Sequence, residues 1–347
     1  MKYQVYARHN LEKIQHFGQL DQVQVRSIRI VSEVLPFKTN NYVVNELIDW
    51  DNYRDDPMYI LNFPQKDMLN PKQFRTLSDM IARQSSKTDL AKYVEEIRLN
   101  LNPHPAGQLE HNVPTMKGTP LTGIQHKYQE TMLFFPTQGQ TCHAYCTFCF
   151  RWPQFTGLSE LKFAMKQINL VIAYLKDNPS ITDILITGGD PMVMKAEVFA
   201  RYVDAILQAD LPNLKTIRIG SKSLSFWPFR FITDPDAGQM LDHFRKMNDS
   251  GLHVAFMAHF NHHRELETDA VKEAVARIRD TGAQIRTQSP LLKHINEDPQ
   301  VWSQMWRMQV ELGMVPYYMF VARDTGAQSY FGVNLDQAHH IFNEDYK

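Results

Sequence analysis

The chain has 347 residues, 43 % of them hydrophobic and 22 % charged, and its 37 lysines and arginines nearly balance 38 aspartates and glutamates. This composition is typical of a soluble globular protein, and the formal net charge of −1 excludes the strongly basic surface of non-specific nucleic-acid binding. No run approaches the roughly 18 apolar residues of a membrane span, and the first residues lack a secretory signal. We therefore expect a cytoplasmic protein that binds neither nucleic acid nor membrane.

Residues 1–125 differ in pattern from the rest of the chain. Apolar residues recur at helical spacing between 69 and 101, and connectors rich in proline and asparagine follow at 102–105 and 114–120. We predict that 1–125 form a helical and loop extension, packed on a barrel domain of residues 126–347.

From about residue 130, apolar segments alternate with segments of helical pattern. Such alternation predicts a parallel α/β sheet with right-handed crossovers, either an open doubly wound sheet or a partial barrel. The predicted strands are 132–135, 183–187, 216–220, 253–258, 284–288 and 314–321. The predicted helices are 158–177, 196–208, one ending at 249–251, 268–280 and 300–312.

Polar residues follow the second to the sixth of the predicted strands, and the loop of residues 142–149 follows the first. Since the carboxyl ends of parallel strands meet at one edge, these side chains are expected to converge where such sheets bind ligands. They are Gly188, Gly189 and Asp190, then Ser221 and Lys222, His259 and Asn261, Gln288 and Ser289, and Arg323 and Asp324. This convergence favours an enzyme.

Cysteine occurs three times, at Cys142, Cys146 and Cys149. Three buried thiols packed as small apolar groups is one interpretation. A structural zinc site would need a fourth ligand, for which His143 lies too close to Cys142 for an unstrained tetrahedron. Iron–sulfur clusters are commonly held by four thiolates, so three would leave one iron open to another ligand. The spacing favours this last interpretation.

The Cys-x3-Cys-x2-Cys loop, with Phe148 before its last cysteine, resembles the motif of radical S-adenosylmethionine (SAM) enzymes. The resemblance implies a partial (β/α)6 barrel and a [4Fe-4S] cluster held by the three cysteines. It also implies that the open iron chelates SAM, whose cleavage yields a 5′-deoxyadenosyl radical that abstracts a substrate hydrogen.

A closer resemblance, to the lysine 2,3-aminomutase family, covers roughly residues 40–342. Its motifs occur in order on the predicted strands, including a Gly-Gly-Asp turn, an Ile-Arg-Ile-Gly-Ser segment and the runs His-Phe-Asn-His and Pro-Tyr-Tyr. The matching segments are 122–128, 185–191, 217–222, 259–262, 288–292 with 295–296, and 316–318.

The resemblance implies roles for individual residues. Arg151, two residues after the last cysteine, would hold a substrate carboxylate or a cofactor phosphate. Asp190 and its two glycines would contact the SAM amino group. The full set implied to bind SAM is Gly188, Gly189, Asp190, Ser221, His259, Asn261 and Gln288.

The chain departs from the family in three places. The Arg-rich run after the third cysteine is here Phe-Arg-Trp-Pro at 150–153. Arg323, followed by Asp324, stands where lysine-specific members carry an aspartate. A cation there would repel a lysine side chain and attract an acidic or neutral one, whereas the alternative is that Asp324 enters the site and Arg323 points outward, so the resemblance does not fix lysine as the substrate. No Gly-rich segment with a pyridoxal phosphate (PLP) lysine follows Phe331, so either a C-terminal piece is absent from the chain or the protein works without PLP.

These features predict a radical SAM isomerase that shifts an amino group between adjacent carbons of an amino acid. The alternative is a PLP-independent radical SAM enzyme that abstracts hydrogen from another substrate. A metal-binding or electron-transfer module is the non-enzymatic reading. A small amino-acid-like substrate and a reductase, flavodoxin or ferredoxin as electron donor are the implied partners, and a homo-oligomer is left open.

Overall fold

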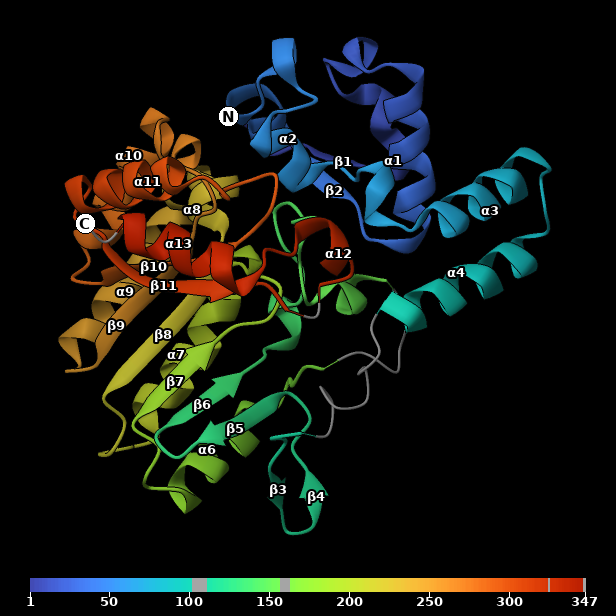
Figure 1. Ribbon diagram of the computed structural model, residues 1–347. Helices are drawn as coiled ribbons and strands as arrows, with labels where there is room; N and C mark the ends of the chain where they lie inside the picture. Colours follow the sequence, from blue (N-terminus) through green and yellow to red (C-terminus); the bar gives the residue numbers. More distant parts are fainter. Residues whose placement is uncertain (102–110, 157–162, 324, 346–347) are drawn as a thin grey trace.

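The computed structural model describes residues 1–101, 111–156, 163–323 and 325–345, and its centre is a curled seven-stranded sheet (Figure 1). The strand order is β11–β10–β9–β8–β7–β6–β5. Strands β6 to β11 run parallel, and β5 is antiparallel to β6. The strands are β5 (Ile124–Tyr128), β6 (Thr131–Phe134), β7 (Asp183–Ile186), β8 (Thr216–Ser221), β9 (His253–His259), β10 (Gln284–Leu291) and β11 (Val315–Val321). This confirms the predicted parallel α/β architecture of a partial barrel.

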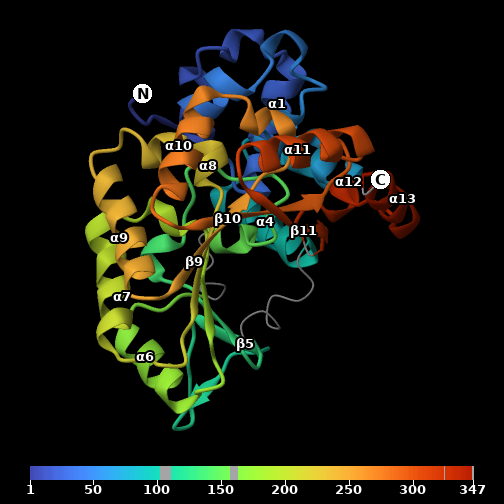
Figure 2. The ribbon, with the colours of Figure 1, turned by 90° about the vertical axis from the view of Figure 1, so that its left-hand side faces the viewer.

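Helices cover the outer face of the sheet, where Figure 2 shows α6, α7 and α9 side by side. Alternate strand residues such as Ile184 and Ile186 are fully buried beneath them, which is the period expected of a strand with one face against helices. Local capping defines the helix ends, as where the Thr268 hydroxyl accepts the Val271 N–H before α10. The covering helices are α6 (Ile168–Asp177), α7 (Ala196–Gln208), α9 (Ala237–Asp249), α10 (Asp269–Arg279) and α11 (Pro299–Glu311).

The N-terminal region gathers at the end of the sheet to which the parallel strands point (Figure 1). Its hydrophobic cluster, around Val31, Tyr59 and Leu61, also takes in Phe148 from the loop after β6 and Phe226 from the short helix after β8. The elements are β1 (Val5–Ala7), β2 (Lys38–Asn40), α1 (Gln22–Val34), α2 (Pro57–Asn62), α3 (Pro71–Ala82) and α4 (Lys87–Leu101). Core packing is thus shared across residue 125, and a division of the chain there stays a prediction.

Shorter elements complete the chain. They are β3 (Thr115–Met116), β4 (Thr119–Pro120), α8 (Ser223–Phe226), α12 (Gln328–Phe331), α13 (Leu335–Asp345), and the short turns η1 (Arg8–Lys13), η2 (Phe17–Gln19), η3 (Val43–Leu47), η4 (Trp50–Asn52), η5 (Lys66–Met68), η6 (Thr137–Gly139), η7 (Trp152–Phe155), η9 (Pro191–Val193), η10 (Pro228–Phe231) and η11 (His263–Leu266). Within the described ranges, no helix has the length and apolar character needed to cross a bilayer.

Two predicted elements differ from those observed, and one observed strand was not predicted. The helix predicted to begin at residue 158 begins at Ile168, because Met165 is extended and exchanges backbone hydrogen bonds with Phe135 and Thr137; residues 157–162 lie outside the described ranges. The helical stretch 69–101 is two helices, separated at Gln84, whose φ is +52°. Strand β5 was not among the six predicted strands, and it adds a seventh to the edge beside β6.

Candidate functional site

The three cysteines lie on the loop that follows β6, at the carboxyl edge of the parallel strands. All are half-buried free thiols. Burial raises the pKa of each, that of Cys149 to about 11, so without a bound cation the thiols are protonated at neutral pH. Iron would supply the positive charge that a thiolate needs here.

The N-terminal region holds this loop through hydrogen bonds. The Lys38 ammonium donates to the Cys142 carbonyl at 2.6 Å, and the Lys38 carbonyl accepts the Tyr145 N–H at 2.7 Å. Farther along, the Thr147 hydroxyl donates to the Ile60 carbonyl at 2.7 Å. Sequence reasoning missed this clamp, because nothing in the local pattern around Lys38 or Ile60 points to a loop a hundred residues away.

The glycine turn after β7 presses against the start of the cysteine loop. A Cβ on Gly189 would lie 2.5 Å from the Thr141 carbonyl oxygen and 2.7 Å from its nitrogen. Gly188 has a φ of +149°, which residues with side chains rarely adopt. These glycines therefore bring two backbones together directly beside Cys142.

We expect Gly189→Ala to destabilise the metal-free protein by about 1–3 kcal/mol, because backbone atoms cannot give way as a flexible side chain would. Urea denaturation measures the change. The matched control is Gly238→Ala in α9, where a Cβ meets nothing within 4 Å and helix propensity favours alanine. Equal midpoints for the two variants would contradict this account of Gly189.

Asp190 is a buried bridge between the ends of β7 and β8. Its carboxylate accepts the Ser221 hydroxyl at 2.8 Å, the Ser223 hydroxyl at 2.9 Å, and the backbone N–H groups of Met192 and Lys222 at 2.9 Å each. Burial nonetheless raises its pKa. The carboxylate is thus occupied by the chain's own donors, and its contact with a SAM amino group stays a prediction.

His143 also points toward this bridge. Its Nδ1 lies 2.9 Å from the Ser223 hydroxyl, and burial lowers its pKa to about 3, so the imidazole is neutral at pH 7. His143 is therefore hydrogen-bonded to Ser223, which does not favour its use as the fourth ligand of a zinc site.

Beyond β8, a buried ion pair joins the ends of two strands. The Lys222 ammonium donates to Glu265 at 2.7 Å and to the Asn261 amide oxygen at 2.8 Å. Asn261 in turn donates to the Ser289 hydroxyl at 3.2 Å. Glu265 was missed by sequence reasoning, although its spacing from His262 has the form of a capping box.

His259, the last residue of β9, directs attention to one ring nitrogen, Nε2. Its Nε2 is buried and has no hydrogen-bond partner within the described part of the chain. Its ring lies 5.7 Å from that of Phe148, and burial holds its pKa well below the usual range. Gln288, opposite His259 in the β9–β10 register, is half-buried. An unpartnered neutral imidazole beside the cysteine loop suits a polar ligand.

Arg151 lies behind the last cysteine. Its Nη2 is 3.3 Å from the Gln140 side-chain oxygen, and its guanidinium stacks 4.4 Å over the Phe135 ring. Its Nε is buried and has no partner among the residues that the structure describes. Burial lowers its pKa to about 10, which leaves the cation intact at neutral pH. Arg323 is exposed just beyond β11, and Asp324 lies outside the described residues.

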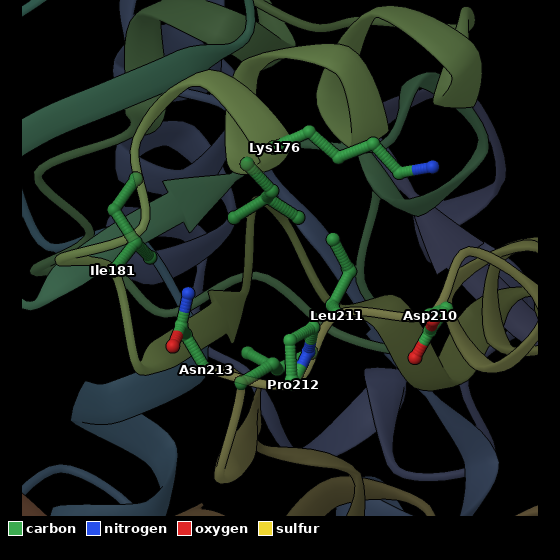
Figure 3. A pocket seen from close by; sticks show the side chains of 8 residues that line it. Lys176, Ile181, Asp210, Leu211, Pro212 and Asn213 are labelled. Atoms are coloured by element: carbon green, nitrogen blue, oxygen red, sulfur yellow. The ribbon is translucent and has the colours of Figure 1, made fainter.

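The cavity in Figure 3 lies away from these residues. It encloses about 350 Å³ between the end of α6 and the segment 210–214 that leads into β8, at the amino edge of the strands. Its lining includes none of the predicted site residues.

The donor set fits an iron–sulfur cluster better than a single ion. Within the described part of the chain, no three Cys, His, Asp or Glu side chains are arranged to hold one metal ion. A four-iron cluster binds each thiolate through a different iron, so its ligands stand farther apart. Three thiols on one loop are the kind of donor that such a cluster takes, and Arg151, two residues after the last of them, has a buried Nε without a partner among the described residues.

Comparisons with known proteins find similar sequences. No protein-family model matches the chain. A provisionally named L-lysine 2,3-aminomutase of Aquifex aeolicus is 28 % identical over 90 % of this chain and 71 % of its own length. The L-lysine 2,3-aminomutases of Clostridium subterminale and Acetoanaerobium sticklandii are 28 % and 29 % identical, over 62 % and 58 % of this chain.

The chain spans about half the length of the latter two relatives, 48 % and 45 % respectively. Among solved structures, Streptococcus suis SuiB bound to S-adenosylmethionine aligns with a TM-score of 0.43 and 12 % identity, over 79 % of this chain and 58 % of that one. The cysteine loop, the strand-end motifs and the sequence relatives together support a place for the chain in the radical SAM, lysine 2,3-aminomutase-like family.

Proposed function

We propose that the protein is a radical SAM enzyme that shifts an amino group between adjacent carbons of an amino acid. The observation that carries the proposal is the loop of three cysteines, held at the carboxyl edge of a parallel half-barrel beside the Gly188–Gly189 turn. The family assignment supports the same chemistry.

The residues of this edge divide the work. Cys142, Cys146 and Cys149 would hold a [4Fe-4S] cluster, which with SAM supplies a 5′-deoxyadenosyl radical for hydrogen abstraction. His259 offers an unpartnered ring nitrogen to SAM. Gln288 is half-buried on the neighbouring strand and would reach the same ligand. Asn261 and Ser221 are bonded to other side chains and would shape the pocket from behind.

Charge suggests the substrate class. Arg151 keeps a buried cation with an unpartnered Nε, suited to a carboxylate. Arg323 stands where lysine-specific relatives carry an aspartate, and a second cation would repel a lysine side chain. The proposed substrate is therefore an acidic or neutral amino acid.

A second candidate is a PLP-independent radical SAM enzyme acting on another substrate. Trp152 replaces an arginine of the family's Arg-rich run; it is buried, and a Cβ on Gly326 would lie 3.0 Å from its indole nitrogen. Arg151 is therefore the only cation of residues 150–153, whereas the family's Arg-rich run offers more than one cation to a cofactor phosphate.

Anaerobic reconstitution with iron and sulfide, followed by dithionite and SAM, tests the proposal. We expect release of 5′-deoxyadenosine by the parent protein and its loss in Cys146→Ala, because two thiolates hold the cluster poorly. Gly238→Ala, on open space in α9, is the control. If Cys146→Ala releases as much 5′-deoxyadenosine as the parent protein, the assignment of the cluster to these cysteines is wrong.

Incubation with PLP and a panel of amino acids separates the two candidates. Migration of an amino group, followed by mass spectrometry and dependent on PLP, supports the aminomutase. Deoxyadenosine release that is indifferent to PLP, with no protein-bound absorbance that borohydride removes, supports the second candidate.

A further inference from the structure

Lys38 contacts the first half of the cysteine loop through both its side chain and its backbone. Its ammonium lies 2.6 Å from the Cys142 carbonyl oxygen and 3.3 Å from the Thr141 hydroxyl. Its own carbonyl accepts the Tyr145 N–H at 2.7 Å, and its ammonium lies 5.4 Å from the Tyr145 ring centre. The side chain and the backbone of one residue therefore span most of the interval between the first two cysteines.

The position of Lys38 is fixed from behind. It lies in β2, where it pairs with Ala7 of β1 in an antiparallel ribbon. Two residues on, the Asn40 side chain donates to the His143 carbonyl at 3.3 Å and to the Phe226 carbonyl at 2.9 Å. The β1–β2 ribbon and the Asn40 hydrogen bonds thus fix the backbone that carries Lys38, and so they hold its ammonium against the cysteine loop.

Among the described residues, the charge of Lys38 has no acidic partner. Its ammonium donates hydrogen bonds to the Cys142 carbonyl and the Thr141 hydroxyl. The other lysine buried at this edge, Lys222, forms an ion pair with Glu265. A half-buried cation without a carboxylate partner therefore lies against the backbone of Cys142, the first of the three cysteines.

We propose that Lys38 is a positioning residue of the cysteine loop whose fixed positive charge raises the reduction potential of the cluster bound there. The inference rests on the proposed function, since it needs the cluster. Reduction adds an electron to a centre already carrying thiolate charge, so a nearby cation stabilises the reduced form more than the oxidised one. Hydrogen bonds and charge around the ligands are known levers on such potentials.

The test uses the full chain, reconstituted anaerobically, in a redox titration followed by electron paramagnetic resonance without SAM. Lys38→Gln keeps a donor near the Cys142 carbonyl but removes the charge, and Lys38→Arg keeps the charge. Lys246→Met is the matched control, because it removes an exposed lysine that pairs with Asp204. We expect the glutamine variant to be harder to reduce by about tenfold, ~59 mV for one electron, and the other two to titrate with the parent.

The outcomes separate the two proposals. If the parent takes up no cluster, the proposed function fails. If the parent takes up a cluster and Lys38→Gln titrates with Lys246→Met, only the role of Lys38 is wrong. Loss of the cluster from Lys38→Gln with retention in Lys38→Arg supports the role, whereas its loss from both folded variants overturns it, since arginine should then have sufficed.

Discussion

Replacing Lys222 by methionine is expected to destabilise the folded, metal-free protein by about 3–5 kcal/mol. Lys222 pairs at 2.7 Å with Glu265, which is fully buried and also accepts the Ser225 hydroxyl and the Asn261 N–H. Methionine can still pack over the Phe226 ring, 4.3 Å from the present ammonium, so the loss is mainly that of the charge. What remains is a carboxylate without its cation in a site that water does not reach.

The pair is best measured as a double-mutant cycle by urea denaturation. Lys222→Met with Glu265→Leu should be less destabilised than Lys222→Met alone, because the second change removes the stranded charge. Lys246→Met again serves as the control; its exposed pair with Asp204 should be worth less than about 1 kcal/mol. A cost for Lys222→Met no greater than that of the control would show that the buried pair contributes nothing.

The sheet was predictable because its signal is local. Ile184 and Ile186, or Ile217 and Ile219, alternate with half-buried residues, and each apolar run is followed by a helical one. The polar residues at the strand ends were predictable for the same reason, since parallel strands share a carboxyl edge. Helix α7 was predicted with both of its ends.

The contacts that hold the site were not predictable. Lys38 and Cys142 are separated by 104 residues, and a lysine after a helix has many surface roles. The start of α6 was misplaced because Met165 extends to pair with Pro136, a tertiary contact that overrides the helical pattern of residues 158–177.

Asp190 marks a different limit. The sequence Gly-Gly-Asp after a strand can serve a ligand or the fold, and both uses favour a short acidic side chain at that turn. Only the structure reveals that Ser221, the last residue of the next strand, and Ser223, two residues later, donate to the same carboxylate. A pattern of residue types identifies the edge of the sheet but not which of its groups already have partners.

Acidification is expected to destabilise the metal-free protein through His262, a buried residue that follows β9. Burial, aided by His263 and Arg264, lowers its pKa to about 3, and its Nδ1 accepts the Arg264 N–H at 3.3 Å. The folded protein therefore keeps this imidazole neutral, whereas the unfolded chain protonates it near pH 6.5. Its contribution is complete above pH 6.5 and is lost as the pH falls toward 3, by about 1.4 kcal/mol per pH unit.

His262→Asn isolates this contribution, because the asparagine oxygen can accept the same N–H but takes up no proton. We expect the variant to lose stability less steeply than the parent between pH 6.5 and 4, in urea titrations at fixed ionic strength. His340→Asn, on the exposed side of α13, is the matched control. Parallel stability curves for the parent and His262→Asn would mean that acid unfolds the protein through other groups, since the slope measures the protons that the unfolded chain binds in excess.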